Sequence, residues 1–190
     1  FPVLADFNGD GTLDIATAYA NGGDVGSDNL SRLGSSKGNA DGTFTRVGGT
    51  SLGIKGANSV VAGDFDNDSR QDIALSFNDT SSSSSGLILL PGKGDGTFSS
   101  PVSVASAVTS IQSPALAADL DGDGKLDLVW GANAYLNRGG NTFTPLDLPV
   151  QGKPLLLADL DGDHLLDIVI DNAVYTGKGD GTFLPTPLAL

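Results

Sequence analysis

The segment DLDGDGKLDL at residues 119–128 decides the fold, because near copies of it recur three more times along the chain. The copies are DFNGDGTLDI at 6–15, DFDNDSRQDI at 64–73 and DLDGDHLLDI at 159–168. Their first residues lie 58, 55 and 40 positions apart. Periods of this length indicate a protein built from repeated supersecondary units.

A second motif follows each copy and marks the later part of each unit. Its Gly-Asp-Gly and Gly-Asn pairs favour tight β-turns, so it is expected to join two strands. Two motifs in the same order four times exclude chance. The motif reads NADGTF at 39–44, KGDGTF at 93–98, RGGNTF at 138–143 and KGDGTF at 178–183. The whole of 1–190 is therefore predicted to be one repeat array, with units at 1–50, 51–105, 106–150 and 151–190.

Short apolar runs of about four to six residues surround these motifs and are rich in Val, Ile, Leu and aromatic residues. Unit 3 shows the pattern in its compact form, with runs at 116–118, 128–130 and 134–136. Runs this short predict strands, and no helical stretch is expected. Four strands per unit are typical of the blades of a β-propeller, which predicts an all-β fold of four-stranded antiparallel sheets. Polar inserts at Asn21–Asn29 and Asn78–Ser85 are expected to be solvated hairpin loops.

The acidity of the chain has an unusual form. All 23 acidic residues are Asp, and the formal net charge is −13. Such a surface repels nucleic acid and anionic membranes, so neither is expected as a partner. No apolar run reaches the ~18 residues of a membrane span. The chain has no Cys, which excludes disulfides and zinc-thiolate sites and leaves metal as the expected staple of a secreted domain.

We number each Asp loop from its first Asp, so that loop 3 places Asp at positions 1, 3, 5 and 9. Ca²⁺ takes six to eight oxygen ligands, and alternate side chains of a curled loop converge on one point. The carbonyl at position 7 is expected to complete the ligand set with water. The predicted ligands are Asp6, Asn8, Asp10, Thr12 and Asp14 in loop 1; Asp64, Asp66, Asp68, Arg70 and Asp72 in loop 2; Asp119, Asp121, Asp123, Lys125 and Asp127 in loop 3; and Asp159, Asp161, Asp163, Leu165 and Asp167 in loop 4.

Fifteen of the 23 aspartates occupy these positions. Without a cation, each loop would crowd like charges at a cost of several kcal/mol. The alternative is a set of Asp-rich turns with solvated charges, which four matching loops disfavour. An EF-hand would need Glu at position 12 and flanking helices, and position 12 is Thr17, Leu75, Trp130 or Ile170. We therefore expect about four Ca²⁺ ions, each between two strands. Mg²⁺ is disfavoured because it keeps its waters.

The pattern D-[FL]-[DN]-x-D-x-x-x-D-[IL], followed by the Thr-Phe turn, resembles the FG-GAP/VCBS repeats of integrin α-subunits and bacterial surface proteins. The resemblance covers nearly the whole chain. It implies a β-propeller with Ca²⁺ in its hairpin loops, an extracellular or cell-surface location, and a role in adhesion, in glycan or protein binding, or as a scaffold beside an enzyme domain.

Propellers of this family commonly have seven blades, whereas this segment has four units. The segment is expected to begin inside a blade and to lack its native start. Three arrangements stay open: a portion of a longer chain, a small four-bladed ring, or copies that associate through open blade edges. The first and third are favoured over the second.

Three functions compete. A binding or adhesion module would use exposed aromatics to stack on sugars, and Trp130, Tyr135 and Tyr175 are the candidates, with core packing as the alternative for each. A structural role would use calcium to harden a surface filament or spacer. Catalysis is not expected, because the chain has one His, no Cys and no Glu, and His164 reads as a turn residue.

Overall fold

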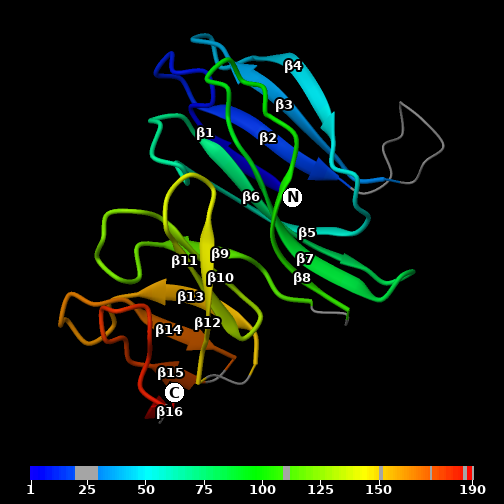
Figure 1. The fold of residues 1–190 in the computed structure, drawn as a ribbon. Coiled ribbons are helices and arrows are strands. Elements are labelled where there is room, and N and C mark those ends of the chain that lie inside the picture. Colours follow the sequence, from blue (N-terminus) through cyan, green and yellow to red (C-terminus); the bar gives the residue numbers. More distant parts are fainter. Residues whose placement is uncertain (20–29, 109–111, 150–151, 172, 186–187, 190) are drawn as a thin grey trace.

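The computed structural model describes residues 1–19, 30–108, 112–149, 152–171, 173–185 and 188–189. All regular structure in these ranges is β-strand, arranged in four separate sheets of four strands (Figure 1). Within each sheet every strand pairs antiparallel with the next strand along the chain. The described residues contain no helix that is long and apolar enough to cross a membrane.

The strands follow the four repeat units. Sheet 1 contains β1 (Pro2–Ala5), β2 (Asp14–Tyr19), β3 (Arg32–Gly38) and β4 (Phe44–Ser51). Sheet 2 contains β5 (Ala57–Gly63), β6 (Asp72–Asp79), β7 (Ser84–Leu90) and β8 (Val102–Ala107). Sheet 3 contains β9 (Leu116–Ala118), β10 (Asp127–Trp130), β11 (Asn133–Asn137) and β12 (Phe143–Asp147). Sheet 4 contains β13 (Pro154–Ala158), β14 (Asp167–Ile170), β15 (Ala173–Tyr175) and β16 (Leu188–Ala189).

The sheets pack face to face in chain order. Three apolar clusters lie between them: the first joins sheets 1 and 2, the second joins sheets 2 and 3, and the third joins sheets 3 and 4. The first strands of consecutive sheets also lie side by side in space: β1 contacts β5, β5 contacts β9, and β9 contacts β13. Each inner sheet is therefore covered on both faces.

Burial along the central strands reflects this packing. In β2 of sheet 1, buried and half-buried residues alternate, as in a strand with one covered face. In β10 of sheet 3 all four residues are buried, and β7 of sheet 2 is buried over its last six residues. A continuous apolar run is the sequence pattern of a strand covered on both faces.

The predicted all-β fold of four-stranded antiparallel sheets is confirmed. The expected loop at Asn78–Ser85 is wrong at its ends, because β6 continues to Asp79 and β7 begins at Ser84. Backbone pairing of Asn78 with Ser85 and of Asp79 with Ser84 lengthens this hairpin, so only residues 80–83 form the turn. The expected loop at Asn21–Asn29 lies outside the described residues. In the described part of the chain the sheets do not close into a ring.

Candidate metal centres

Each Asp loop is the hairpin between the first and second strands of its sheet. In loop 3 the chain leaves β9 at Ala118, curls through the acidic residues and enters β10 at Asp127. The ninth-position Asp of every loop is likewise the first residue of a second strand. The strand pairing therefore fixes both ends of the loop, and the side chains between them are held to a small volume.

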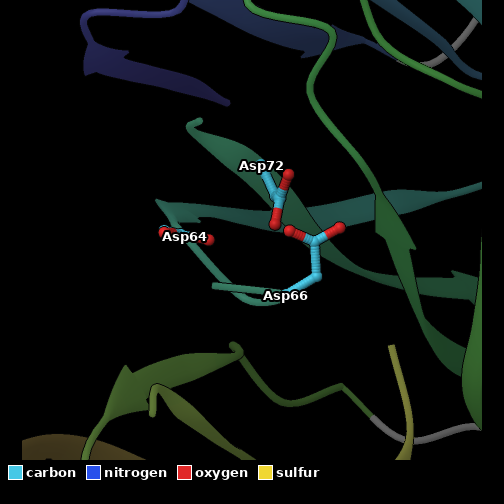
Figure 2. A group of neighbouring side chains, drawn as sticks. All are labelled: Asp64, Asp66 and Asp72. Atoms are coloured by element: carbon cyan, nitrogen blue, oxygen red, sulfur yellow. The ribbon is translucent and has the colours of Figure 1, made fainter. Parts of the chain in front are cut away.

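Carboxylates at positions 1, 3 and 9 converge in three of the four loops. In each, one oxygen from each of the three carboxylates lies within 4.8 Å of the others. Figure 2 shows this arrangement in loop 2, where the side chains of Asp66 and Asp72 point toward each other. The three groups are Asp64, Asp66 and Asp72; Asp119, Asp121 and Asp127; and Asp159, Asp161 and Asp167.

Loop 1 carries an amide at position 3 and keeps the same local arrangement. The Asn8 side-chain amide donates to Asp14 Oδ1 at 3.3 Å, which brings positions 3 and 9 together. The amide oxygen of Asn8 accepts a hydrogen bond from the Asp10 backbone N–H at 3.0 Å. Loop 1 therefore offers one less carboxylate at the same point.

The first aspartate of each loop organises the backbone curl. In loop 3 the Gly122 N–H donates to Asp119 Oδ1 at 2.8 Å, and the Gly124 N–H donates to Asp119 Oδ2 at 2.9 Å. These bonds require a tight turn at positions 4 and 6, where Gly122 and Gly124 have φ of 73° and 82°. Glycine adopts this left-handed region without steric cost.

Two loops place other residues in the same conformation. Position 6 is Ser69 in loop 2 with φ of 67°, and His164 in loop 4 with φ of 69°. A side chain in this region costs about 1–2 kcal/mol. The backbone bond is nevertheless kept, because the His164 N–H donates to Asp159 Oδ2 at 3.0 Å. His164 is thus a turn residue whose geometry is imposed by the loop.

The ninth-position aspartates have a second role that the sequence analysis missed. Each is buried, and its two oxygens accept backbone hydrogen bonds, one from the second loop position and one from the end of the third strand or just beyond it. Asp127 Oδ2 accepts from the Leu120 N–H at 2.8 Å, and its Oδ1 accepts from the Asn137 N–H at 2.7 Å, at the end of the third strand. The same pair of bonds recurs in the other three loops, with Asp14, Asp72 and Asp167 as acceptors. The apolar run that directly follows each of these aspartates was the available signal, because it predicts a buried strand that begins at the Asp.

Burial shapes the electrostatics of these groups. It raises the pKa of the Asp72 carboxyl to about 6, against the opposing effect of its two backbone hydrogen bonds. Burial raises the pKa of Asp127 in the same way. For Asp66, burial is again the main cause of a raised pKa, and the negative charges of Asp68 and Asp64 add to it. These carboxylates lie where negative charge is unfavourable, and a divalent cation among them would offset that cost.

The oxygen atoms available in loop 2 fit a hard cation. Asp66 Oδ1 is buried and makes no hydrogen bond in the described part of the chain. A buried carboxylate oxygen without a partner is costly, and it faces two further carboxylates in the same small volume. Sites made only of oxygen suit Ca²⁺, Mg²⁺ or Mn²⁺ and disfavour zinc and copper.

Position 5 is not part of the converging groups. Its carboxylate pairs instead with a nearby cation in three loops: Lys37 with Asp10 at 2.7 Å, Lys125 with Asp123 at 2.6 Å, and Arg70 with Asp68. The position-7 residues Thr12, Arg70, Lys125 and Leu165 each donate their backbone N–H to the position-5 carboxylate. Calcium ligation by the position-5 side chains and the position-7 carbonyls stays a prediction.

The three aromatic candidates for ligand stacking lie inside the protein. Trp130 and Tyr135 are buried between sheets 2 and 3, and Tyr175 is buried between sheets 3 and 4. Their placement favours the core-packing alternative, because a buried ring offers no face to a sugar.

Comparison with protein-family models matches residues 6–75 and 76–130 to the FG-GAP-like repeat. A search of curated proteins found no match. Among solved structures, the V. cholerae biofilm matrix protein Bap1 is similar over 96% of this chain, at 16% identity and a TM-score of 0.49, and the match spans 30% of that protein. The Photorhabdus luminescens Tc holotoxin pore is similar over 100% of this chain, at 19% identity and a TM-score of 0.33, and the match spans 12% of it. Structural scores this low carry no functional argument.

Proposed function

The chain belongs to the FG-GAP-like repeat family, and from that premise we propose that it is a calcium-binding module whose four sheets are β-propeller blades. In this proposal Ca²⁺ binds in the Asp loops and holds the hairpin between the first two strands of each blade. The observation that carries it is the convergence of three carboxylates within 4.8 Å in loops 2, 3 and 4.

Calcium is favoured over the other oxygen-seeking cations by the shape of the loops. Ca²⁺ accepts six to eight ligands in flexible geometry, whereas Mg²⁺ demands a near-ideal octahedron and keeps several waters. Each loop offers several side-chain oxygens from one short segment, which is the way protein loops bind Ca²⁺.

The ions are proposed to be structural staples. Their ligands come from hairpins that the strand pairing already positions, so binding stabilises the folded state alone. An ion that binds only the folded state raises the free energy of unfolding by about 2.7 kcal/mol per site at a hundredfold excess over its Kd. Extracellular calcium modules work with Kd values of about 10⁻⁴–10⁻³ M, so such sites would be filled outside the cell, where we place this chain.

Equilibrium dialysis against ⁴⁵Ca²⁺, followed by thermal unfolding with and without EDTA, tests this proposal. We expect about four bound ions per chain and a large fall in Tm when EDTA is added. Mg²⁺ at the same concentration is the control and is expected to restore only a small part of the Tm. No bound calcium at millimolar concentration, together with an unchanged Tm, would contradict the proposal.

Beyond calcium, we propose a non-catalytic role in adhesion, or in binding a glycan or protein ligand, with a structural spacer or a scaffold beside an enzyme domain as the alternatives. Two acidic side chains outside the loops support a non-catalytic role. Asp79 has its pKa lowered to about 2 by its hydrogen bonds to Ser81 and Ser82. Asp147 accepts a hydrogen bond from the Asn133 side chain at 2.6 Å on the surface. A glycan array at saturating Ca²⁺ separates lectin activity from the other roles.

A further inference from the structure

The contacts between consecutive sheets follow one rule, which begins at the second position of each Asp loop. Phe7, Phe65 and Leu120 occupy this position in loops 1 to 3, and all three are buried beneath the following sheet. Phe7 meets Phe98 of sheet 2 edge to face, with ring centroids 5.3 Å apart. Each sheet therefore offers a forward face, which receives the next sheet, and a backward face, which docks on the one before.

Hydrogen bonds also join consecutive sheets at these contacts, which we call seams. The carbonyl of Phe7 accepts from the Gly96 N–H at 3.0 Å, and the carbonyl of Leu120 accepts from the Gly181 N–H at 3.0 Å. Both donors lie in the Gly-Asp-Gly-Thr-Phe turn of the following sheet. At the seam between sheets 2 and 3, the Asn137 side chain donates to the Phe65 carbonyl at 2.7 Å instead. One backbone carbonyl thus anchors every seam.

The forward face of sheet 4 has the same features, and no other described sheet packs on it. Leu160, at the second loop position, is 49% exposed. Leu156, three residues before the loop, is also 49% exposed, whereas its counterparts in the other sheets pack into the seams. Those counterparts are Val3, Val61 and Leu116.

The backward face of sheet 1 is the matching half. Phe44, in the Thr-Phe turn, is 50% exposed, although Phe98 and Phe183 at the same place are buried. Leu13, at the eighth loop position, is 59% exposed, whereas Leu126 and Leu166 pack against the seam clusters. Both end faces therefore carry large apolar side chains that this repeat elsewhere covers.

The two end faces also complement each other in volume. A hollow of about 230 Å³ lies on sheet 1 where Thr17 pairs with Gly34, while the same places in sheet 2 hold Leu75 and Ile88. The forward face of sheet 4 carries bulkier side chains than that of sheet 1. It carries Val169 and Val174 at the places of Ala16 and Ser35. Small residues on one face and bulkier ones on the other suit a seam between sheets 4 and 1.

We propose that the backward face of sheet 1 docks on the forward face of sheet 4 in a second copy of this chain. The contact reproduces the three internal seams, with Leu160 under Phe44 and the Leu160 carbonyl facing the turn around Gly42. This interface is heterologous, so it closes into a ring or extends into a filament. Two copies in a ring would place eight sheets around one axis, within the usual range of four to eight blades. Docking of this kind requires folded sheets but does not require occupied calcium sites.

Two charge-introducing variants test the proposal by sedimentation velocity in calcium-containing buffer of physiological salt. Leu160→Asp disables the forward face, and Phe44→Asp disables the backward face. The wild-type chain is expected to associate in a concentration-dependent manner, and each variant alone is expected to be monomeric. A mixture of the two variants should give a dimer, because each retains the half that the other needs.

Val108→Asp is the matched control, since Val108 is 91% exposed and directly follows β8 of sheet 2, which is an inner sheet. Circular dichroism and Tm establish that all three variants fold. A wild-type chain that stays monomeric at several hundred micromolar would overturn the proposal. Association that persists in both single variants would also overturn it. So would two monomeric variants that do not associate when they are mixed, because a symmetric interface that contains both residues would give this result.

Discussion

The buried aspartate at the end of each loop joins three parts of its sheet. Asp127 accepts hydrogen bonds from the backbone of Leu120 in the loop and of Asn137 in the third strand. The same carboxylate belongs to a converging group of acidic side chains. Its contribution to the fold should therefore be separable from its proposed role as a metal ligand.

The substitution Asp127→Ala should destabilise the protein even without metal. It leaves two buried N–H groups without acceptors, at a cost of about 1–3 kcal/mol for each. Urea denaturation in EDTA measures this loss. Asp123→Ala is the control, because Asp123 pairs with Lys125 at the surface, where solvent screens the pair and its contribution to stability is small. Equal losses for the two variants would show that the buried carboxylate has no structural role.

A second residue-scale prediction concerns the strained turn of loop 4. Replacing His164 by Gly should raise the free energy of unfolding by up to about 1 kcal/mol, because φ of 69° is unfavourable for a side chain. The larger backbone entropy of Gly in the unfolded chain limits the gain. Gly162→Ala, at φ of 85° with nothing near the added Cβ, is the opposite control and should destabilise. Chemical denaturation of the pair decides whether backbone strain is present.

At the scale of single elements, β7 shows how an aromatic ring takes the place of a side chain. Gly86 pairs with Phe77 across the β6–β7 hairpin, and the ring covers the glycine. A Cβ at Gly86 would lie 2.6 Å from Phe77 Cε1 and 2.7 Å from the Ala105 carbonyl oxygen. This close approach explains a glycine in the interior of a buried strand.

Gly86→Ala is accordingly expected to cost roughly 1–3 kcal/mol, since the ring and the β8 backbone must both shift. Thermal unfolding followed by circular dichroism measures the change. Gly48→Ala in β4 is the control, because no atom lies within 4 Å of an added Cβ there. If the control lost as much stability as Gly86→Ala, the ring contact would not be the cause.

The strands also show which features of the fold could be predicted from the sequence and which could not. The loop spacing and the short apolar runs predicted the four sheets, because strand period and turn chemistry are local properties. The ends of the β6–β7 hairpin were missed, since Asn78 and Ser85 are polar yet pair in the ladder. The aromatic candidates Trp130 and Tyr175 could not be separated from core residues by pattern alone, because burial depends on which sheets face each other.

At the scale of the whole molecule, the four loops differ in burial and should differ in affinity. In loop 4 the aspartates at positions 1 and 3 are exposed, whereas in loops 2 and 3 they are half-buried. Loop 3 alone combines four aspartates with glycine at both left-handed positions. We expect loop 3 to bind Ca²⁺ most tightly, and loop 4 to bind it more weakly than loops 2 and 3.

Isothermal titration of Asp121→Ala and Asp161→Ala checks this order. The first substitution should remove the tightest binding step, and the second should remove a weaker step and leave the tightest in place. Both replace the third loop position, so the two variants control for each other. Loss of the tightest step in Asp161→Ala would reverse the predicted order.

One seam differs from the other two in whether a backbone or a side-chain group donates its hydrogen bond. The Phe7 and Leu120 carbonyls are bound by backbone amides, which no substitution short of proline removes. The Phe65 carbonyl is bound by the side chain of Asn137. A point substitution of Asn137 would therefore remove the hydrogen bond to the Phe65 carbonyl. The contact in the middle of this chain, between its first and second pairs of sheets, is therefore the one whose carbonyl hydrogen bond depends on a side chain.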